Sequence, residues 1–595
     1  MRISLKYAVL SVALLPFFFM VYQWGKCDLN HVDTLSRDGE AGLEHALKDP
    51  HGAGYESFHP RAAQSYNHVK EMEMPPLKYR EIECVINGDY SVKGRREGKE
   101  IYLPFSFIQK YFEVYGSVEQ YDGYDRFEFQ HSYSQVFPPG DKYTPSGVFM
   151  SFEYYNVEDR NRVKCISGVE GVPVSTQWDN SGHFYPIQIA QYGLSHYSKY
   201  LGPNKRRIKV LENGNDMNSL GNWMLTERRS QLAFQMDNTN MENTVVEFAT
   251  QEQIKNPGIS LSVDEGKLFT LSMDIKFMNK GSITVLLRTG EGNIFRIHYI
   301  QSNEMMRLEG RDLYYGIGKD IQGKWIHFSR MILIDFQKGL TLKHSKSKSR
   351  KIQKTTKIAA ICLRGRGLLD NMTLSNNAHL DFFFDAANYL VRNQDYRGGW
   401  PIMVKRSLIP DVMELDPGWY SAMGQGQAIS LLVRAYLVSK DKKYLDAAGK
   451  ALEIFELPSD KGGVVSKYAF TYDWFEEYPT KPSSFVLNGF IYSLIGLYDL
   501  KEVASGPTRE LAEKLYNSGS RTLKAMLLMF DNGSGTFYDL RHITAGLPPN
   551  RARWDYHTVH INQLLLLSQI DSDPLFSTTA QRWQEYMKGH RSPHN

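Results

Sequence analysis

Hydrophobic and polar residues alternate with a period of two from residue 77 onward, which predicts β-strands. Short apolar strands, such as EIECVI at 81–86, IYLPF at 101–105 and DRFEF at 125–129, are separated by turn-forming residues. This spacing is typical of hairpins. We therefore predict a β-hairpin-rich domain over residues 77–204.

Longer alternating runs follow and keep the same period. They include FTLSMDI at 269–275, SITVLL at 282–287 and FRIHYI at 295–300, with Gly and Asn turns between them. Several alternating strands at this spacing predict a β-sandwich or barrel, here over residues 205–377.

After Ala378 the hydrophobic period changes to about 3.6, which predicts successive helices. We expect them over residues 379–394, 420–438, 442–455, 484–503, 508–530, 557–569 and 576–588. The amides Gln427, Asn488 and Asn562 recur near helix starts, at separations of 61 and 74 residues. Such degenerate repetition predicts an (α/α) toroid-like catalytic domain over residues 378–595, with helix starts building a cleft at one end. The expected fold class is multidomain α and β.

The N-terminal region has a different pattern. Residues 7–24 carry no charge and are about long enough to cross a bilayer core of roughly 30 Å. A cleaved signal peptide is the alternative, but no small-x-small cleavage site follows. We expect a transmembrane signal anchor at 7–24, a cytoplasmic tail at 1–6 and a luminal stem at 25–76. So short a span suits a thin early secretory membrane, which favours a single-pass type II protein of the Golgi membrane.

Composition narrows the function classes. The 70 basic and 66 acidic residues give a net charge of +4, too small to indicate nucleic-acid binding, so no nucleic-acid partner is expected. The 4 cysteines exclude a disulfide framework. The 36 tyrosines, 31 phenylalanines and 9 tryptophans are typical of carbohydrate-binding surfaces, although β-sandwich cores also use aromatics.

Three stretches of the helical region set a tyrosine beside an acid: WFEEYP at 474–479, TFYDLRH at 536–542 and RARWDYH at 551–557. Tyrosine can give or take a proton, a carboxylate can take one, and arginine binds an acidic substrate through paired hydrogen bonds. The combination indicates proton chemistry on an acidic sugar. From the pattern alone it is equally probable that these tyrosines are core aromatics and that the amides Asn488 and Asn562 are buried and hydrogen-bonded to the backbone.

Longer motifs add a resemblance. The chain resembles the heparan sulfate D-glucuronyl C5-epimerase family over roughly residues 77–595. The motifs that carry the resemblance are KGRREG at 93–98, QYDGYDRFEF at 120–129, GVFMSF at 147–152, RVKCISGVEGVP at 162–173, FYPIQIAQYGLSHY at 184–197, GWPIM at 399–403, EYPT at 477–480, YDLR at 538–541 and RWDYH at 553–557.

The resemblance implies an isomerase that converts D-glucuronic acid into L-iduronic acid within N-sulfated heparosan, during heparan sulfate and heparin biosynthesis. Inversion at C5 needs proton exchange on opposite ring faces, hence at least two acid–base groups, and its carbanion or enolate needs stabilisation. By resemblance, Glu477 and Tyr556 are the opposed catalytic pair, assisted by Tyr478 and Tyr538. A tyrosine that acts as a base needs nearby positive charge, because its ordinary pKa is near 10.

Eight further residues are candidate substrate contacts. For Arg541, Arg551 and Arg553 a salt bridge with Asp539 or Asp555 is the alternative, and for the pair at 405–406 it is a solvated loop. The set is Tyr143, Arg162, Lys405, Arg406, Asn488, Arg541, Arg551 and Arg553.

The resemblance also implies a homodimer and a structural calcium ion in the β-sandwich. Asp370, Glu242 and Asn243 match the expected ligands, whereas Asn213 and Asn215 stand where a threonine and a glutamate are expected. Losing a carboxylate weakens calcium binding. No cofactor is expected for catalysis. Other heparan sulfate biosynthetic enzymes are candidate partners.

Other functions use the same kinds of residue. A polysaccharide lyase acting on uronic acid polymers abstracts the same C5 proton and then eliminates at C4, so sequence chemistry does not separate it from an epimerase. A glycosyltransferase with DSD at 571–573, or a glycan-binding protein with a degenerate site, are the remaining readings. The chain has no Gly-rich dinucleotide fingerprint, which argues against a nicotinamide-dependent epimerase.

Overall fold

A computed structural model describes residues 80–86, 90–105, 114–121, 123–131, 135–237, 240–251, 258–343, 352, 356–588 and 590–593. The expected tail, signal anchor and stem lie outside the described residues. Within these ranges, no helix has both the length and the hydrophobicity that a membrane span requires.

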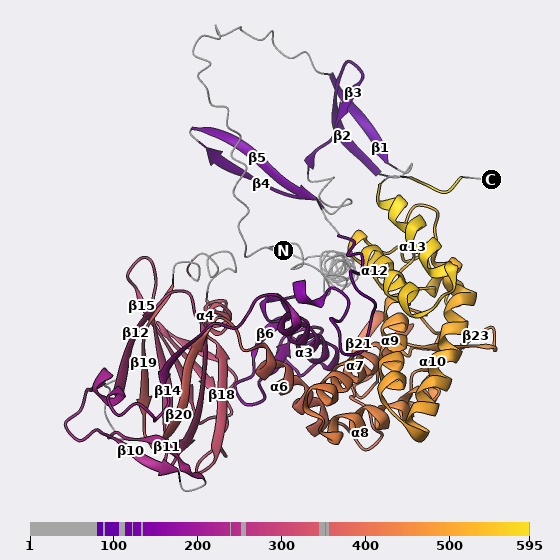
Figure 1. Ribbon diagram of the computed structural model, residues 1–595. Helices are drawn as coiled ribbons and strands as arrows, with labels where there is room; N and C mark the ends of the chain where they lie inside the picture. The colour runs from indigo at the N-terminus through magenta and orange to yellow at the C-terminus, as the bar shows by residue number, and fades with distance from the viewer. Residues whose placement is uncertain are drawn as a thin grey trace, which may run out of the picture.

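Two separate antiparallel units begin the described chain (Figure 1). β1 (Arg80–Ile86), β2 (Tyr90–Glu97) and β3 (Glu100–Tyr102) form one sheet, and β4 (Val114–Tyr121) pairs with β5 (Tyr124–His131) in a hairpin. A further small hairpin joins β6 (Val163–Ile166) to β7 (Pro173–Ser175). These units agree with the hairpins expected from the alternating pattern.

The region assigned to the hairpin domain also contains a helix that the sequence analysis does not predict. Helix α3 (Pro186–Leu201) starts with proline in its first turn, which favours helix initiation, and 13 of its residues are buried. It packs against helices α6 and α7 and shares their hydrophobic core. Residues 186–201 therefore belong with the helical domain, although they precede the β-sandwich in the chain.

An antiparallel sheet and a mixed sheet, whose parallel pair is β15 with β17, pack face to face in the region of the predicted sandwich. One has the order β10-β11-β20-β13-β18, with β8 also paired to β20, and the other has the order β16-β17-β15-β14-β19-β12-β9. Alternate residues from both sheets, such as Met273, Val285 and Leu363, fill a common core. The strands are β8 (Ile208–Glu212), β9 (Trp223–Leu225), β10 (Gln231–Asp237), β11 (Asn240–Ala249), β12 (Ile259–Glu265), β13 (Thr270–Phe277), β14 (Ser282–Arg288), β15 (Ile294–Ile300), β16 (Arg307–Glu309), β17 (Asp312–Gly316), β18 (Trp325–Met331), β19 (Lys357–Arg364) and β20 (Arg366–Ser375), and helix α4 (Ile332–Leu340) follows β18.

Helices follow one another from residue 379 to the C-terminus, as predicted. They are α6 (His379–Arg392), α7 (Ala422–Ser439), α8 (Lys442–Lys450), α9 (Leu487–Val503), α10 (Gly506–Met526), the short α11 (Arg541–Thr544), α12 (Trp554–Ile570) and α13 (Pro574–Met587). Two hairpins interrupt them, formed by β21 (Arg406–Ile409) with β22 (Met413–Leu415) and by β23 (Val465–Tyr468) with β24 (Tyr472–Phe475).

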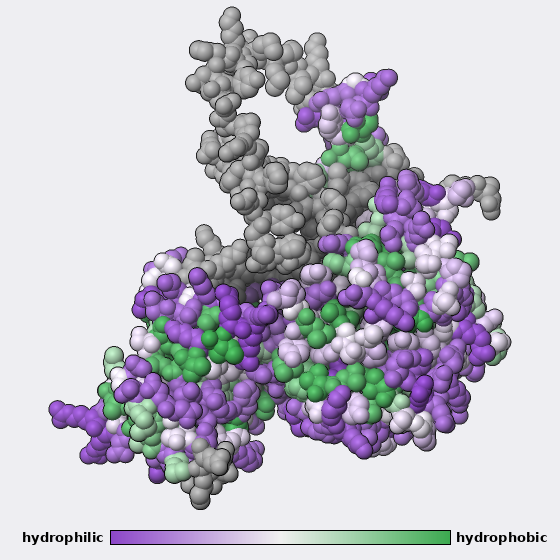
Figure 2. Space-filling model, viewed as in Figure 1, coloured by the Kyte–Doolittle hydropathy of each residue, from purple (hydrophilic) through white to green (hydrophobic). Residues whose placement is uncertain are grey.

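The helices form an inner and an outer row. Helix α3 packs on α7, α7 on α9 and α9 on α12, and α6, α8, α10 and α13 pack outside them. Helices α7 and α9 approach closely because Gly426 faces Ser493, and a Cβ there would collide with the α9 backbone. Hydrophilic residues cover most of the face shown in Figure 2, so the two cores lie beneath a mainly polar surface.

Candidate active site

A cavity lies where the four inner helices begin, and it encloses about 1060 Å³ of empty space including its open mouth. Helix starts favour negative charge because their first backbone N–H groups lack partners inside the helix. The lining residues are Phe137, Met150, Ser151, Phe152, Tyr154, Tyr155, Arg160, Gln177, Tyr185, Ile187, Gln188, Gln191, Met423, Glu477, Tyr478, Asn488, Tyr492, Asp555, Tyr556, Val559 and Asn562.

Backbone hydrogen bonds bring the three tyrosine–acid stretches together. The Leu487 N–H at the start of α9 donates to the Tyr538 carbonyl over 3.1 Å, and the Ala552 N–H donates to the Thr536 carbonyl over 2.8 Å. On the other side, the Ala422 N–H at the start of α7 donates to the Glu476 carbonyl over 2.9 Å. Segments far apart in the sequence thus form one wall beside the inner helices.

Glu477 is a buried carboxyl group of this wall that lines the cavity, with 4% of its surface exposed. Desolvation raises its pKa from 4.5 to about 7, against the opposing effects of hydrogen bonding from Tyr478 and Tyr538 and the charge of Arg406. Gly489, at the start of α9, makes room for this carboxyl group, since an added Cβ would overlap Glu477 Oε2. A carboxyl group with this pKa can both take and give a proton near neutral pH.

Three tyrosines surround Glu477, and each has a pKa well above its ordinary value. Burial is the main cause for Tyr478, Tyr538 and Tyr556, and the negative charge of Glu477 adds to it. The rings of Tyr538 and Tyr556 meet edge to face, with centroids 4.8 Å apart. These hydroxyl groups therefore keep their protons in the ligand-free protein, which makes them proton donors.

Three arginines supply positive charge to Glu477 and Tyr556. The Arg406 guanidinium lies over the Trp178 ring, 4.8 Å from its centroid, and over the Tyr478 ring at 5.6 Å. Its charge favours the anion of Glu477, and the charges of Arg553 and Arg162 favour the anion of Tyr556. Arg553 forms an ion pair with Asp555 at 3.3 Å, at the start of α12.

Asn488 also faces the cavity, as the sequence analysis expects. Its side chain is 3% exposed, and Oδ1 has no hydrogen-bond partner among the described residues. Its amide nitrogen lies 4.0 Å from Met423 Sδ. The orphan oxygen is placed to accept a hydrogen bond from a bound hydroxyl group.

Other predicted contacts are engaged elsewhere. Tyr143 lies in the helical core, where its hydroxyl donates to Asp499 over 2.8 Å and accepts from Arg434 over 3.1 Å. Lys405 pairs with Glu414 at 2.7 Å, and Arg551 donates to Ser534 over 3.0 Å.

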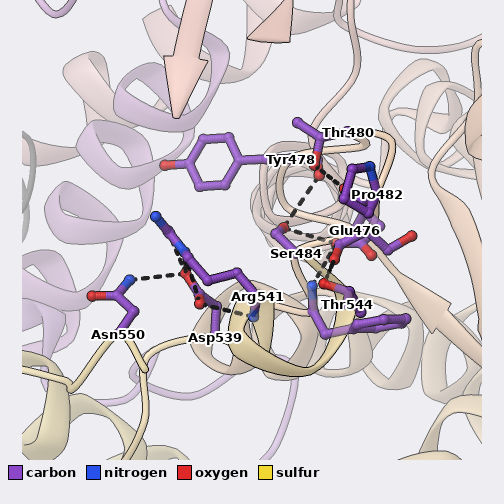
Figure 3. Close-up of polar contacts among 11 residues, drawn as sticks. Glu476, Tyr478, Thr480, Pro482, Ser484, Asp539, Arg541, Thr544 and Asn550 are labelled. Carbon is purple, nitrogen blue, oxygen red and sulfur yellow. Dashed lines mark hydrogen bonds and ion pairs between the residues drawn. The ribbon is translucent and has the colours of Figure 1, made fainter. Parts of the chain in front are cut away.

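Arg541 forms the salt bridge that the sequence analysis gives as its alternative role. Its Nε donates to both carboxylate oxygens of Asp539, at 2.9 and 2.7 Å, and Asn550 donates to the same carboxylate over 2.8 Å. Figure 3 shows this cluster beside Tyr478. Arg541 is thus held close to the wall but is not among the residues that line the cavity.

Several cavity residues are not among the predicted contacts, and most come from α3 or the segment before it. Tyr185 stands at the N-terminal cap of α3 and is buried, and Gln188 and Gln191 follow on one face of the helix. Tyr155 and Arg160 come from the preceding loops. For Tyr185, Gln188 and Gln191 the signal in the sequence is FYPIQIAQYGLSHY at 184–197, a motif of the resemblance in which the sequence analysis places no helix.

The structure brings several of the residues expected to hold calcium into one region of the sandwich. Asn243 donates to Asp370 Oδ2 over 2.9 Å, and the turn in which the Asn215 N–H donates to Asn213 Oδ1 over 3.1 Å lies against Thr244, the next residue of β11. The side chain of Glu242 is not among those described. No cluster of three or more His, Cys, Asp or Glu side chains suited to a metal ion occurs in the described part of the chain. Calcium binding therefore stays a prediction of the resemblance, and no step of the proposed chemistry uses the ion.

Comparison with known proteins adds independent information. The family description "D-glucuronyl C5-epimerase C-terminus" matches residues 394–585, and "D-glucuronyl C5-epimerase, beta-sandwich domain" matches residues 242–366. The D-glucuronyl C5-epimerase of Caenorhabditis elegans is 36% identical over 571 residues, covering 88% of this chain and 92% of that protein. An uncharacterised protein of Methanocaldococcus jannaschii is 30% identical over 175 residues, covering 29% of this chain and 53% of that protein. The two matched regions include most of the sandwich and most of the helical domain.

Proposed function

Because this chain belongs to the D-glucuronyl C5-epimerase family and is therefore an epimerase, we propose that it converts D-glucuronic acid into L-iduronic acid within N-sulfated heparosan. This activity would serve heparan sulfate and heparin biosynthesis. The observation that carries the proposal is the meeting of a buried carboxyl group of pKa about 7, Glu477, with the protonated hydroxyl of Tyr556 in one cavity.

We assign proton abstraction to Glu477. Its carboxylate takes the hydrogen from C5, and the electron pair of the broken C–H bond delocalises into the uronate carboxyl group. The resulting enolate carries extra negative charge on its oxygens, which the charges of Arg406 and Arg162 and the starts of the inner helices stabilise.

Tyr556 then delivers its hydroxyl proton to C5 from the opposite face. Inversion leaves Glu477 protonated and Tyr556 as its anion, so the proton must return to Tyr556 before the next turnover. Tyr538 favours the Glu477 anion through a hydrogen bond and packs against the Tyr556 ring, so its hydroxyl is suited to relay this proton. The high pKa of Tyr556 makes its reprotonation favourable.

We also propose that the protein is a homodimer, as the resemblance to its family implies, and that residues 7–24 anchor it in the Golgi membrane with the enzyme in the lumen. The support is the apolar N-terminal run of the sequence and its basic flank, Arg2 and Lys6. Selective permeabilisation and antibody labelling of a C-terminal tag would test the orientation. A tag accessible from the cytoplasm would contradict it.

Incubation of N-sulfated heparosan in deuterium oxide tests the reaction, with NMR detection of both C5 deuterium and iduronate. The parent protein is expected to form both, and Tyr556→Phe is expected to form iduronate about 10²- to 10⁴-fold more slowly, because it lacks the acid for one face. Tyr396→Phe, at a tyrosine that is 89% exposed, is the matched control. Absence of C5 deuterium, or release of an unsaturated uronate that absorbs in the ultraviolet, would overturn the proposal.

A further inference from the structure

Glu476 is a second buried carboxyl group, next to Glu477 in the chain, that the proposed chemistry does not use. It directly follows β24, is fully buried and is not among the residues that line the cavity. Desolvation raises the pKa of its carboxyl group to about 8, and hydrogen bonds from the Phe485 N–H and from serine hydroxyls oppose this effect only in part. Burying a carboxyl group away from the substrate is costly, so its hydrogen bonds indicate what it does.

The Glu476 carboxyl group binds the segment that leads into α9. Its Oε2 accepts a hydrogen bond from the Phe485 N–H over 3.1 Å and from the Ser484 hydroxyl over 3.2 Å (Figure 3). Phe485 has a backbone φ of +54°, in the left-handed region that residues other than glycine rarely adopt. Helix α9 begins two residues later, at Leu487. The carboxyl group therefore stabilises an unfavourable backbone conformation directly before the helix.

The same segment lies beside the stretch that carries Tyr538. The Ser484 carbonyl accepts from the Leu540 N–H over 3.0 Å, and the Leu487 N–H donates to the Tyr538 carbonyl over 3.1 Å. Residues 484–487 are therefore paired with residues 538–540. A group that holds the segment before α9 in place also holds the backbone that presents the Tyr538 side chain.

The start of α9 is in turn fitted to Glu477. Gly489 lies against that side chain, since an added Cβ would come within 2.4 Å of Glu477 Oε2. The main chain of Glu476 is anchored separately, because its N–H donates to the Val464 carbonyl over 2.8 Å and its carbonyl accepts from the Ala422 N–H over 2.9 Å. From this fixed position, the Glu476 carboxyl group sets where the first turn of α9 lies relative to Glu477.

We propose that Glu476 is a positioning residue, whose carboxyl group holds the segment before α9 so that Glu477 and Tyr538 are placed for proton transfer at C5. The inference rests on the proposed function for the reaction at C5. In this role Glu476 is a hydrogen-bond acceptor of the right length, and it transfers no proton. Because its pKa is about 8, the carboxyl group is mostly neutral at pH 7, and an amide of the same length mimics it. An amide does not replace an acid or base.

Substitutions of Glu476 separate an acceptor of the right length from an acid. The rate of iduronate formation in N-sulfated heparosan gives kcat and KM. Glu476→Gln keeps the acceptor, so its kcat should remain within about threefold of the parent value. Glu476→Met has a similar length but no such acceptor. Its kcat should fall on the order of 10- to 100-fold with less than about a threefold change in KM, because misplaced groups slow proton transfer.

Two further variants complete the comparison. Glu476→Asp keeps the acid but is one methylene shorter, so it should lose activity as Glu476→Met does, and it serves as the test if the methionine variant does not fold. Glu227→Met is the matched control. It removes another buried carboxyl group, which lies in the β-sandwich and accepts from the Gln251 N–H over 3.2 Å, and it should keep the kcat of the parent.

Two measurements distinguish misplacement of Glu477 from a general loss of stability. In Glu476→Met the displaced Glu477 carboxyl group should gain contact with water, so its pKa should fall and the rise of kcat/KM with pH should move to lower pH. Crystal structures of the ligand-free parent and of Glu476→Met should differ at Phe485, which leaves its left-handed conformation, and in the first turn of α9.

Several outcomes would overturn the positioning role of Glu476. One is parental kcat in both Glu476→Met and Glu476→Asp. Another is a loss in Glu476→Gln as large as that in Glu476→Met, which would make Glu476 an acid or base of the reaction. A third is an equal loss in the control Glu227→Met, which would attribute the effect to stability alone.

The proposed function can fail separately from this inference. If the parent forms no iduronate and incorporates no C5 deuterium, but the start of α9 is displaced in the crystal structure of Glu476→Met, the epimerisation proposal fails and the control of Glu477 by Glu476 stands. If the parent epimerises the polymer and both Glu476→Met and Glu476→Asp keep its kcat, only the positioning role fails.

Discussion

At the scale of single residues, burial of Glu477 links its proposed proton abstraction to the stability of the fold. Its folded-state pKa of about 7 exceeds its ordinary value of 4.5, so the fold favours the protonated form. The resulting destabilisation is absent below about pH 4, grows between 4.5 and 7, and is complete above 7. A buried carboxylate at neutral pH is therefore retained at the expense of stability, as is common at active sites.

Glu477→Gln should consequently be inactive but more stable. We expect its free energy of unfolding at pH 8 to exceed that of the parent by up to about 3 kcal/mol, and to match it at pH 4. Urea denaturation at the two pH values measures the difference. A variant that is less stable than the parent at pH 8 would contradict the raised pKa, and epimerisation at the parent rate would contradict the catalytic role.

Arg406 offers a second residue-scale prediction, through the pH dependence of the rate. Glu477 must be ionised to take the C5 proton, so kcat/KM should rise with pH and level off above about 7. Arg406→Gln removes a charge that favours the anion, and the rising limb should move to higher pH by about one unit. The neighbouring Lys405→Gln is the control, because Lys405 is exposed and paired with Glu414. If kcat/KM rises over the same pH range in Arg406→Gln and in the parent, the charge of Arg406 does not influence the ionisation of Glu477.

Residue roles show what the sequence could and could not predict. The motif EYPT identifies Glu477 and Tyr478 from the sequence alone, because an acidic residue next to a tyrosine can be recognised without knowing the fold. The sequence does not predict the partner of Arg541, because a guanidinium can pair equally well with Asp539 or with a substrate carboxylate. Tyr143 was placed by resemblance, and only the packing of α7 against α9 reveals Asp499 and Arg434 beside it.

At the scale of elements, position in the chain explains why α3 was not predicted. Thirteen of its residues are buried, but so are 14 residues of α7 and 13 of α9, both of which the periodicity predicted. Strands precede and follow it in the chain, which favoured a β assignment. The outer helices α8 and α10 have one buried and one exposed face, and the 3.6-residue pattern predicted both.

The start of α9 allows a prediction about an element that serves the site. Gly489→Ala should leave helix content unchanged, because alanine is the better helix former by about 1 kcal/mol. Its Cβ would nevertheless overlap Glu477 Oε2 and displace the carboxyl group, so kcat should fall at least about tenfold. Circular dichroism and the iduronate assay measure the two effects.

Gly221→Ala is the matched control for this substitution. A Cβ at Gly221 meets no atom within 4 Å, and its backbone φ lies outside the left-handed range. If Gly489→Ala retained the kcat of the control, the close approach of α9 to Glu477 would have no catalytic importance.

At the scale of the whole molecule, the β-sandwich is inserted between α3 and α6, two helices that pack against each other. The chain therefore leaves the helical domain after α3 and returns to it at α6. Contacts between the sandwich and the helical domain consequently help to position the helices that form the cavity. Arg330 on β18 makes such contacts, donating to the Ser167 and Ile166 carbonyls at the end of β6, over 2.9 and 2.8 Å. The strand β7 and then α3 follow β6, so this side chain connects the sandwich to an inner helix of the site.

Arg330→Met should destabilise the protein by about 3 to 5 kcal/mol, because it leaves Asp335 buried without its cation and two carbonyl groups without their donor. Arg296→Met provides the comparison on the same sandwich. Its ion pair with Asp312 at 3.1 Å is about half exposed, and losing it should cost less than about 1 kcal/mol. Urea denaturation followed by tryptophan fluorescence gives both values. If the two substitutions lower the free energy of unfolding by similar amounts, the Arg330–Asp335 pair contributes no more than a surface ion pair does. Other contacts would then hold the sandwich to the helical domain.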